Sequence, residues 1–248
     1  MSAPHAARPR GPTLKRRAGV LLRLPVGVFL VSWQYFWRIT ALHRSESRGD
    51  VRDLPPPLPP ELVDEHSKLL AHGVGPMFHR RFRVWIEGSS MSPEELVDAV
   101  ADNPNRVAPS TVAVFHKTRG DHWAVRVGDE YRVQMPGPWD GPVRVVARDA
   151  TSLRLGTLQG HLEAGQIEFR ACYVDGLLEF GTEAWSRAGD RWADVLYSRL
   201  RVAKEIQFNM WVHFCLRAAA IAGGRVAGGV VIDTRGIAED LCHDAAGR

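Results

Sequence analysis

Residues 190–221 read DRWADVLYSRLRVAKEIQFNMWVHFCLRAAAI, and this stretch decides the fold that the sequence predicts. At about 100° per residue, its apolar side chains gather on one broad helical stripe. The stripe consists of Trp192, Val195, Leu196, Leu200, Ala203, Ile206, Met210, Phe214 and Ala218, and it lies opposite Asp194, Arg201 and Glu205. We therefore expect an amphipathic helix laid on a sheet. The second half of this helix also carries apolar side chains outside the stripe. Another segment must therefore cover the face of the helix that points away from the sheet.

The residues before this helix predict an antiparallel sheet. Residues 80–88 alternate apolar and charged side chains as a strand does, and Ser92, Pro93 and Glu95 then begin a helix with a capping box. Six further stretches have strand character and are separated by turns: residues 111–117, 129–136, 142–149, 151–158, 166–174 and 177–185. A sheet whose only large partner is one helix must curve around it. The predicted fold class is α+β: a helix-grip fold in which about seven strands wrap a long C-terminal helix, with an extra N-terminal helix.

The N-terminal residues differ in charge from the rest of the chain. Residues 1–52 hold ten Lys and Arg against two Asp and Glu, whereas the remaining residues hold 22 against 26. Because the basic excess is confined to residues 1–52, the remaining, mildly acidic residues are not expected to bind nucleic acid. We expect an aromatic helix over about 18–39, which either docks on the domain core or touches a membrane peripherally through residues 8–39. A true membrane span or a cleaved signal is the third alternative.

Composition also sets the expected domain boundaries. Residues 53–60 form a proline-rich linker and residues 61–222 the helix-grip domain. Residues 223–248 form a glycine-rich tail that we expect to be flexible, although VVID at 230–233 could add a short edge strand. Three widely spaced cysteines without a CxxC motif disfavour a disulfide framework or a zinc site. We expect a cytoplasmic protein, peripheral at the inner face of the membrane if the N-terminal helix touches it, without cofactor or metal.

Four stretches carry a resemblance to a known family. They are GVGPMFHRRFRVWI at 73–86, MPGPWDGPVRVV at 135–146, GHLEAGQIEF at 160–169 and DRWADVLYSRLRVAKEIQFNMW at 190–211. Together they resemble the bacterial proteins grouped as domain of unknown function 1990, over roughly residues 60–220. That group is similar in fold to the START and Bet v 1-like helix-grip superfamily, whose members mostly bind lipids or other hydrophobic ligands. The resemblance implies a cavity between sheet and helix, but the group has no settled activity.

The segment GHLEAG at 160–165 is the main candidate for chemistry. In a strand, His161 and Glu163 point the same way and could form an acid–base pair or bind a metal, with His116 or His79 as a third ligand. The H-x-E of zinc deaminases is present, but the P-C-x-x-C that follows it there is missing, and so is H-E-x-x-H. Two other interpretations stay open: a polar wall that contacts a ligand, and a structural turn with satisfied hydrogen bonds.

Other candidate ligand contacts lie on the long helix, in one loop and along the strands. Arg199 falls within the apolar stripe, where a charge must be paired or reach a polar ligand, and Gln207 lies at the edge of the stripe. The alternative for Arg199 is a salt bridge to Glu168, Glu179 or Glu183. Trp139 lies in a stiff proline-rich loop, where it either closes a cavity mouth or packs on the core. By strand and helix parity the expected lining residues are Phe82, Trp139, Phe169, Tyr173, Phe180, Met210 and Phe214.

These patterns favour a non-enzymatic protein that binds a hydrophobic small molecule or lipid between the sheet and the C-terminal helix. One alternative is a cavity enzyme, a cyclase, hydrolase or isomerase that uses His161 and Glu163. The other is a membrane-associated scaffold whose cavity is filled by its own side chains.

Overall fold

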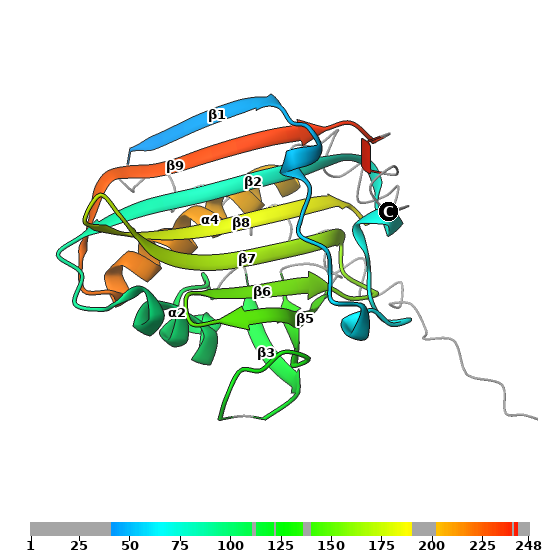
Figure 1. The fold of residues 1–248 in the computed structure, drawn as a ribbon, viewed down its shortest axis with the longest axis horizontal. Helices are drawn as coiled ribbons and strands as arrows, with labels where there is room; N and C mark the ends of the chain where they lie inside the picture. The colour runs from blue at the N-terminus through cyan, green and yellow to red at the C-terminus, as the bar shows by residue number, and fades with distance from the viewer. Residues whose placement is uncertain are drawn as a thin grey trace, which may run out of the picture.

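The fold is an α+β arrangement of one large curved sheet and a long helix (Figure 1). The computed structural model describes residues 41–110, 113–121, 123–135, 140–189, 202–239 and 241–242. The strands are β1 (Leu42–Arg48), β2 (Val74–Glu87), β3 (Val114–Arg119), β4 (Glu130–Gln134), β5 (Asp140–Asp149), β6 (Ser152–Thr157), β7 (Glu163–Val174), β8 (Leu177–Ala188) and β9 (Arg225–Ile237). The α-helices are α2 (Pro93–Asp102) and α4 (Val202–Ile221), and the 3-10 turns are η1 (Val51–Asp53), η2 (Pro60–Leu62), η3 (Leu70–His72) and η4 (Pro104–Arg106).

The strand order is β1-β9-β2-β8-β7-β6-β5-β4-β3, and every neighbouring pair is antiparallel except β1 and β9. This confirms the predicted α+β fold. The strand number is nine rather than about seven, because β1 was not predicted and β9 was considered only as a short edge strand at 230–233, whereas it spans Arg225–Ile237 inside the sheet. The capping box at Ser92 and Glu95 is also confirmed at the start of α2.

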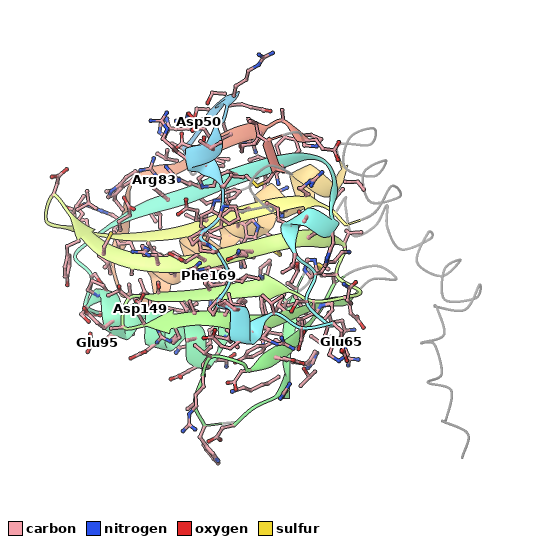
Figure 2. The ribbon with its side chains drawn as sticks, turned by 45° about the vertical axis from the view of Figure 1, so that its right-hand side comes forward. Asp50, Glu65, Arg83, Glu95, Asp149 and Phe169 are labelled. Atoms are coloured by element: carbon pink, nitrogen blue, oxygen red, sulfur yellow. The ribbon has the colours of Figure 1, made fainter. Side chains whose placement is uncertain are left out.

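Helix α4 packs on one face of the sheet and meets β2, β8 and β9 there (Figure 1). The alternation predicted for residues 80–88 brings Phe82, Val84 and Ile86 to this face, and all three are buried. Phe169 of β7 stacks on Phe214 of α4 at 4.7 Å between ring centroids. In Figure 2, Phe169 lies near the middle of the sheet, whereas labelled charged residues such as Asp50 lie toward its periphery. The core is therefore the layer between this inner face and α4.

Strand β9 corrects the expectation of a flexible C-terminal tail. The structure places Arg225–Ile237 between β1 and β2, so its backbone is paired on both sides. Gly228 and Gly229 have φ values of 73° and 96° and lie where the β2–β9 register shifts. A Cβ on Gly229 would lie 2.2 Å from the carbonyl oxygen of Ala41. The glycines that predicted flexibility therefore form a bulge that only glycine fits.

The proline-rich linker is also corrected, because residues 50–72 cross the outer face of the sheet, the face opposite α4 (Figure 1). We call residues 50–72 the strap. Gln166 Nε2 donates to the carbonyl oxygen of Pro56 at 3.0 Å, and the buried Arg144 donates to Asp64 at 2.9 Å. Proline lacks an N–H but keeps its carbonyl, so an extended proline-rich segment can still be bound by donors from the sheet. The strap therefore continues across the predicted boundary between linker and domain at residue 61, and both sides of that boundary are bound to the sheet.

The helix predicted over about 18–39 lies outside the described residues, so its docking on the core or on a membrane stays a prediction. No helix in the described part of the chain is both long and apolar enough to cross a membrane.

Candidate functional site

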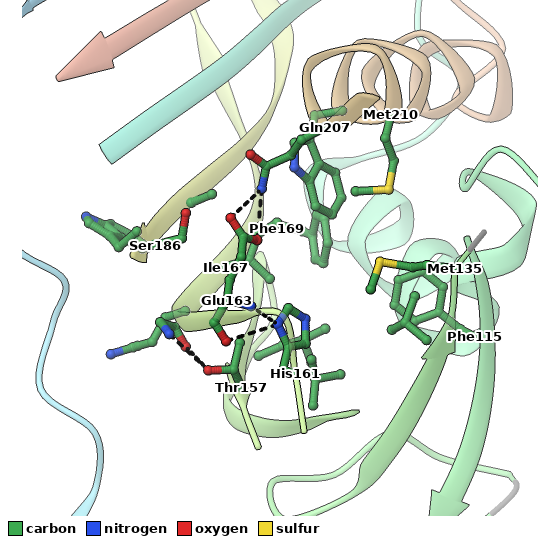
Figure 3. Close-up of a pocket in the computed structure, with 18 residues that line it drawn as sticks. Phe115, Met135, Thr157, His161, Glu163, Ile167, Phe169, Ser186, Gln207 and Met210 are labelled. Atoms are coloured by element: carbon green, nitrogen blue, oxygen red, sulfur yellow. Dashed lines mark hydrogen bonds between the residues drawn. The ribbon is translucent and has the colours of Figure 1, made fainter. Parts of the chain in front are cut away.

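A pocket of about 90 Å³ lies between the first described turns of α4 and the inner face of the sheet. Its walls are mainly apolar and aromatic: Phe115, Met135, Ile167, Phe169, Met210 and Trp211. Met210 approaches from α4 and Met135 from the end of β4 (Figure 3). The polar side chains His161, Glu163 and Gln207 gather at another part of the wall. The pocket therefore combines an apolar body with one polar end.

The polar end begins where β7 begins. His161 Nδ1 accepts the backbone N–H of Glu163 at 2.9 Å, which closes the turn before the strand (Figure 3). The same nitrogen lies 3.1 Å from the carbonyl oxygen of Glu163, so both backbone groups of that residue contact the ring. Burial lowers the pKa of the imidazole; the nearby Glu163 acts against this shift and Lys68 adds to it. His161 therefore bonds the main chain of Glu163, and among the described hydrogen bonds none joins its ring to the Glu163 carboxylate, so their action as an acid–base pair stays a prediction.

The Glu163 carboxylate is instead held by α4. Gln207 Nε2 donates to both carboxylate oxygens, at 3.1 and 3.0 Å (Figure 3). Arg80 NH1 of β2 donates to Gln207 Oε1 at 2.7 Å, which fixes the orientation of the amide. Arg80 and Gln207 are both buried. The chain Arg80–Gln207–Glu163 thus ties three elements together at the pocket wall.

Arg80 is the residue of this site that the sequence interpretation missed. The alternation of residues 80–88 marks it only as one of several charged strand residues. In the structure only 1% of Arg80 is exposed, and its guanidinium lies 4.7 Å from the Phe78 ring centroid. The signal was present, because Arg80 has the same strand parity as Phe82 and therefore faces inward.

The structure separates the other predicted site residues into three groups. His161, Glu163, Gln207, Phe169 and Met210 line the pocket. Phe82, Phe180 and Phe214 are buried in the core but do not line the pocket. Tyr173 is 62% exposed, because it stands near the tip of the β7–β8 hairpin; its predicted role as a lining residue is wrong. Arg199 and Trp139 lie outside the described residues, so their roles stay predictions.

The two histidines considered as a third metal ligand beside His161 and Glu163 lie outside the pocket. His79 is buried on the outer face of the sheet, where its ring nitrogens contact Asp53 at 3.2 Å and Glu183 at 2.5 Å. His116 is exposed on β3. Within the described ranges, no group of three or more His, Cys, Asp or Glu side chains could hold a metal ion. Glu168 and Glu183, considered as partners of Arg199, bind Arg154 and Arg81 respectively.

The lowered pKa of His161 gives a testable pH dependence. We expect its imidazole to titrate below the ordinary value of 6.5, because burial disfavours the charged ring. The stabilisation from the neutral ring is then present above about pH 6.5 and is lost as the pH falls toward the folded-state pKa. An NMR titration of the histidine ring protons, assigned by comparison with His161→Gln, measures the midpoint. A midpoint at or above 6.5 would contradict a buried neutral ring.

One family model matches the sequence: the family described as domain of unknown function, DUF1990, matches residues 55–217. No curated protein gives a significant match.

Several solved structures resemble the fold at low identity. The di-domain ARO/CYC StfQ from the steffimycin biosynthetic pathway is 9% identical with a TM-score of 0.46, over 60% of this chain and 51% of that one. The hypothetical protein jhp0584 from Helicobacter pylori is 11% identical with a TM-score of 0.42, over 57% and 87%. The major latex-like protein 151 from Panax ginseng is 14% identical with a TM-score of 0.37, over 55% and 97%. The chain thus spans about half the length of StfQ, and at these TM-scores none of the similarities bears on function.

Proposed function

Because the chain belongs to the DUF1990 family and encloses a pocket between its sheet and α4, we propose that it binds a small hydrophobic molecule non-covalently in that pocket. The family description names no activity, so the pocket itself carries the proposal. The observation that supports it best is the contrast within the wall: aromatic and aliphatic side chains surround a polar end fixed by Arg80 and Gln207. Apolar walls supply affinity, and a few fixed polar groups orient a ligand.

The pocket volume limits the size of the ligand. About 90 Å³ is well below the roughly 300–1,000 Å³ of pockets for drug-sized ligands. A lipid chain would therefore require wall side chains to move. Met135 and Met210 are suited to this, because unbranched thioether side chains change rotamer readily. We favour a ligand of a few heavy atoms, or a larger one that displaces these two side chains.

Two measurements on the full chain test ligand binding. Native and denaturing mass spectra of gently purified protein should differ by a co-purified small molecule bound one to one. Xenon, which enters dry apolar cavities, should shift the methyl resonances of Met135 and Met210 in ¹³C-methyl-methionine-labelled protein. The absence of both a bound molecule and a xenon shift would overturn the proposal.

A filled-pocket variant supplies the control. Ala184 of β8 is buried and lines the pocket, so Ala184→Leu should occupy part of it and abolish the xenon shift. Overpacking of this kind costs about 1–3 kcal/mol, so folding is checked by circular dichroism. Ala188→Leu, on the same strand but outside the pocket lining, should leave the xenon shift in place. A bound mass that persists in Ala184→Leu would mean that the ligand lies elsewhere.

Acid–base catalysis has weaker geometric support. His161 and Glu163 line the same pocket, but the imidazole accepts a backbone N–H and the carboxylate is held by Gln207. The enzyme alternative predicts a bell-shaped pH–rate profile and loss of turnover in His161→Gln with ligand binding retained.

A further inference from the structure

The polar end of the pocket has a charge that narrows the class of ligand. Among the described residues that line the pocket, Glu163 is the only Asp, Glu, Lys or Arg. His161 does not balance this charge at pH 7, because its ring contacts the main chain of Glu163 and burial lowers the pKa of the imidazole below 6.5. The pocket therefore presents one carboxylate against apolar and aromatic walls.

The carboxylate is only partly satisfied by the described protein groups. An ionised carboxylate can accept about four hydrogen bonds, yet the described contacts of the Glu163 side chain come from the single nitrogen of Gln207, shared between both oxygens. Glu163 is half-buried, and a partly desolvated carboxylate with so few donors gains from a further donor. The acceptor sites that Gln207 does not use are thus available to a ligand.

Two described cations lie around this end of the pocket without lining it: Arg80, and Lys68, whose Nζ donates to the carbonyl oxygen of His161 at 2.5 Å. Arg80 is joined to Glu163 through the Gln207 amide. Coulomb energy falls with distance, so a ligand cation in direct contact with the carboxylate gains more from Glu163 than it loses to Arg80 and Lys68, neither of which lines the pocket. Three aromatic residues of the wall, Phe115, Phe169 and Trp211, add cation–π attraction for the same kind of ligand.

From this geometry we propose that the pocket binds a small organic ammonium ion, with its nitrogen on the Glu163 carboxylate and its alkyl or aryl part against the aromatic wall. This rests on the proposed function and deepens it by naming the ligand class. Gln207 is a positioning residue: it orients the carboxylate through α4, and Arg80 orients Gln207.

The test compares three probes of matched size: n-butylammonium, 1-butanol and butyrate. Each is titrated at pH 7 into full-length protein while the Met135 and Met210 methyl resonances are followed, because both side chains line the pocket. We expect n-butylammonium to bind about tenfold more tightly than 1-butanol, since a charge-assisted hydrogen bond is about twice as strong as a neutral one and the cation–π attraction adds to it. Butyrate should bind more weakly than either.

Two carboxyl variants locate the effect. Glu163→Gln keeps the side-chain shape and an acceptor for Gln207, and it should lose the tenfold preference for the ammonium ion while binding 1-butanol within about twofold of wild type. Glu179→Gln removes a carboxylate from the outer face of β8, and it should keep the preference. Retained xenon binding shows that each variant still has the pocket.

The outcomes separate this inference from the proposed function. If 1-butanol or butyrate binds as tightly as n-butylammonium, or if Glu163→Gln keeps the preference, the ammonium assignment is wrong although the pocket binds small molecules. If neither xenon nor any of the three probes binds, both the proposed function and the ammonium assignment are wrong.

Discussion

Replacing Phe214 by alanine is expected to lower the free energy of unfolding by about 3–5 kcal/mol, the cost of removing a large buried aromatic side chain and leaving a cavity. Phe214 has no exposed surface. Its ring centroid lies 4.7 Å from that of Phe169, 5.6 Å from Trp211 and 6.3 Å from Phe180. Because these rings come from the sheet and from α4, neither layer can move to fill the space without losing contacts elsewhere.

Urea unfolding followed by far-ultraviolet circular dichroism measures this loss. Tyr173→Ala is the matched control, because Tyr173 is 62% exposed and its removal should change stability by about 0.5 kcal/mol or less. Similar losses in the two variants would mean that α4 does not close the core over the sheet.

Replacing Gly165 by alanine is expected to cost about 3 kcal/mol, because the new methyl group meets backbone rather than a movable side chain. Gly165 has a φ of 155°, and a Cβ there would lie 1.9 Å from the carbonyl oxygen of Trp185. Strand β7 must then shift against β8, with which Gly165 pairs opposite Ser186. Gly165 also lines the pocket, so the same shift should weaken xenon binding.

Gly181→Ala provides the control for this prediction. Gly181 lies in the neighbouring strand β8, and the nearest atom to a Cβ there is the Phe82 carbonyl oxygen at an ordinary 3.6 Å. Its substitution should change stability by less than about 1 kcal/mol in either direction. Thermal and urea unfolding of both variants give the comparison, and equal stabilities of the Gly165 and Gly181 variants would contradict a close backbone approach at Gly165.

Much of the sheet could be predicted from local pattern. Phe82, Val84 and Ile86 are buried as their alternation predicts, and Ser92 caps α2 as expected. These features depend on residues close together in the chain, whose side-chain direction follows from backbone geometry alone. Parity also placed Phe169 correctly, but it failed at Tyr173, because parity gives the face of a strand and not how far the covering helix extends along it.

The parts that could not be predicted depend on pairing between distant residues. The glycines of β9 are typical of flexible segments, and only the close approach of Ala41 and the register shift against β2 show that they form a bulge. The prolines of the strap are typical of a linker, and only Gln166 and Arg144 show where the strap is bound. Local composition cannot indicate hydrogen-bond partners that lie 80 or more residues away in the chain.

The sequence by itself determined the α+β class, the inward faces of most strands and the candidate residues His161, Glu163 and Gln207, because periodicity reports side-chain direction. Only the tertiary structure decided how these residues act together. It turned His161 toward the main chain of Glu163, and it placed Gln207 between Glu163 and an arginine on β2. Residues 80, 163 and 207 are far apart in the chain, and their hydrogen bonds exist only because the curved sheet and α4 bring three elements to one point.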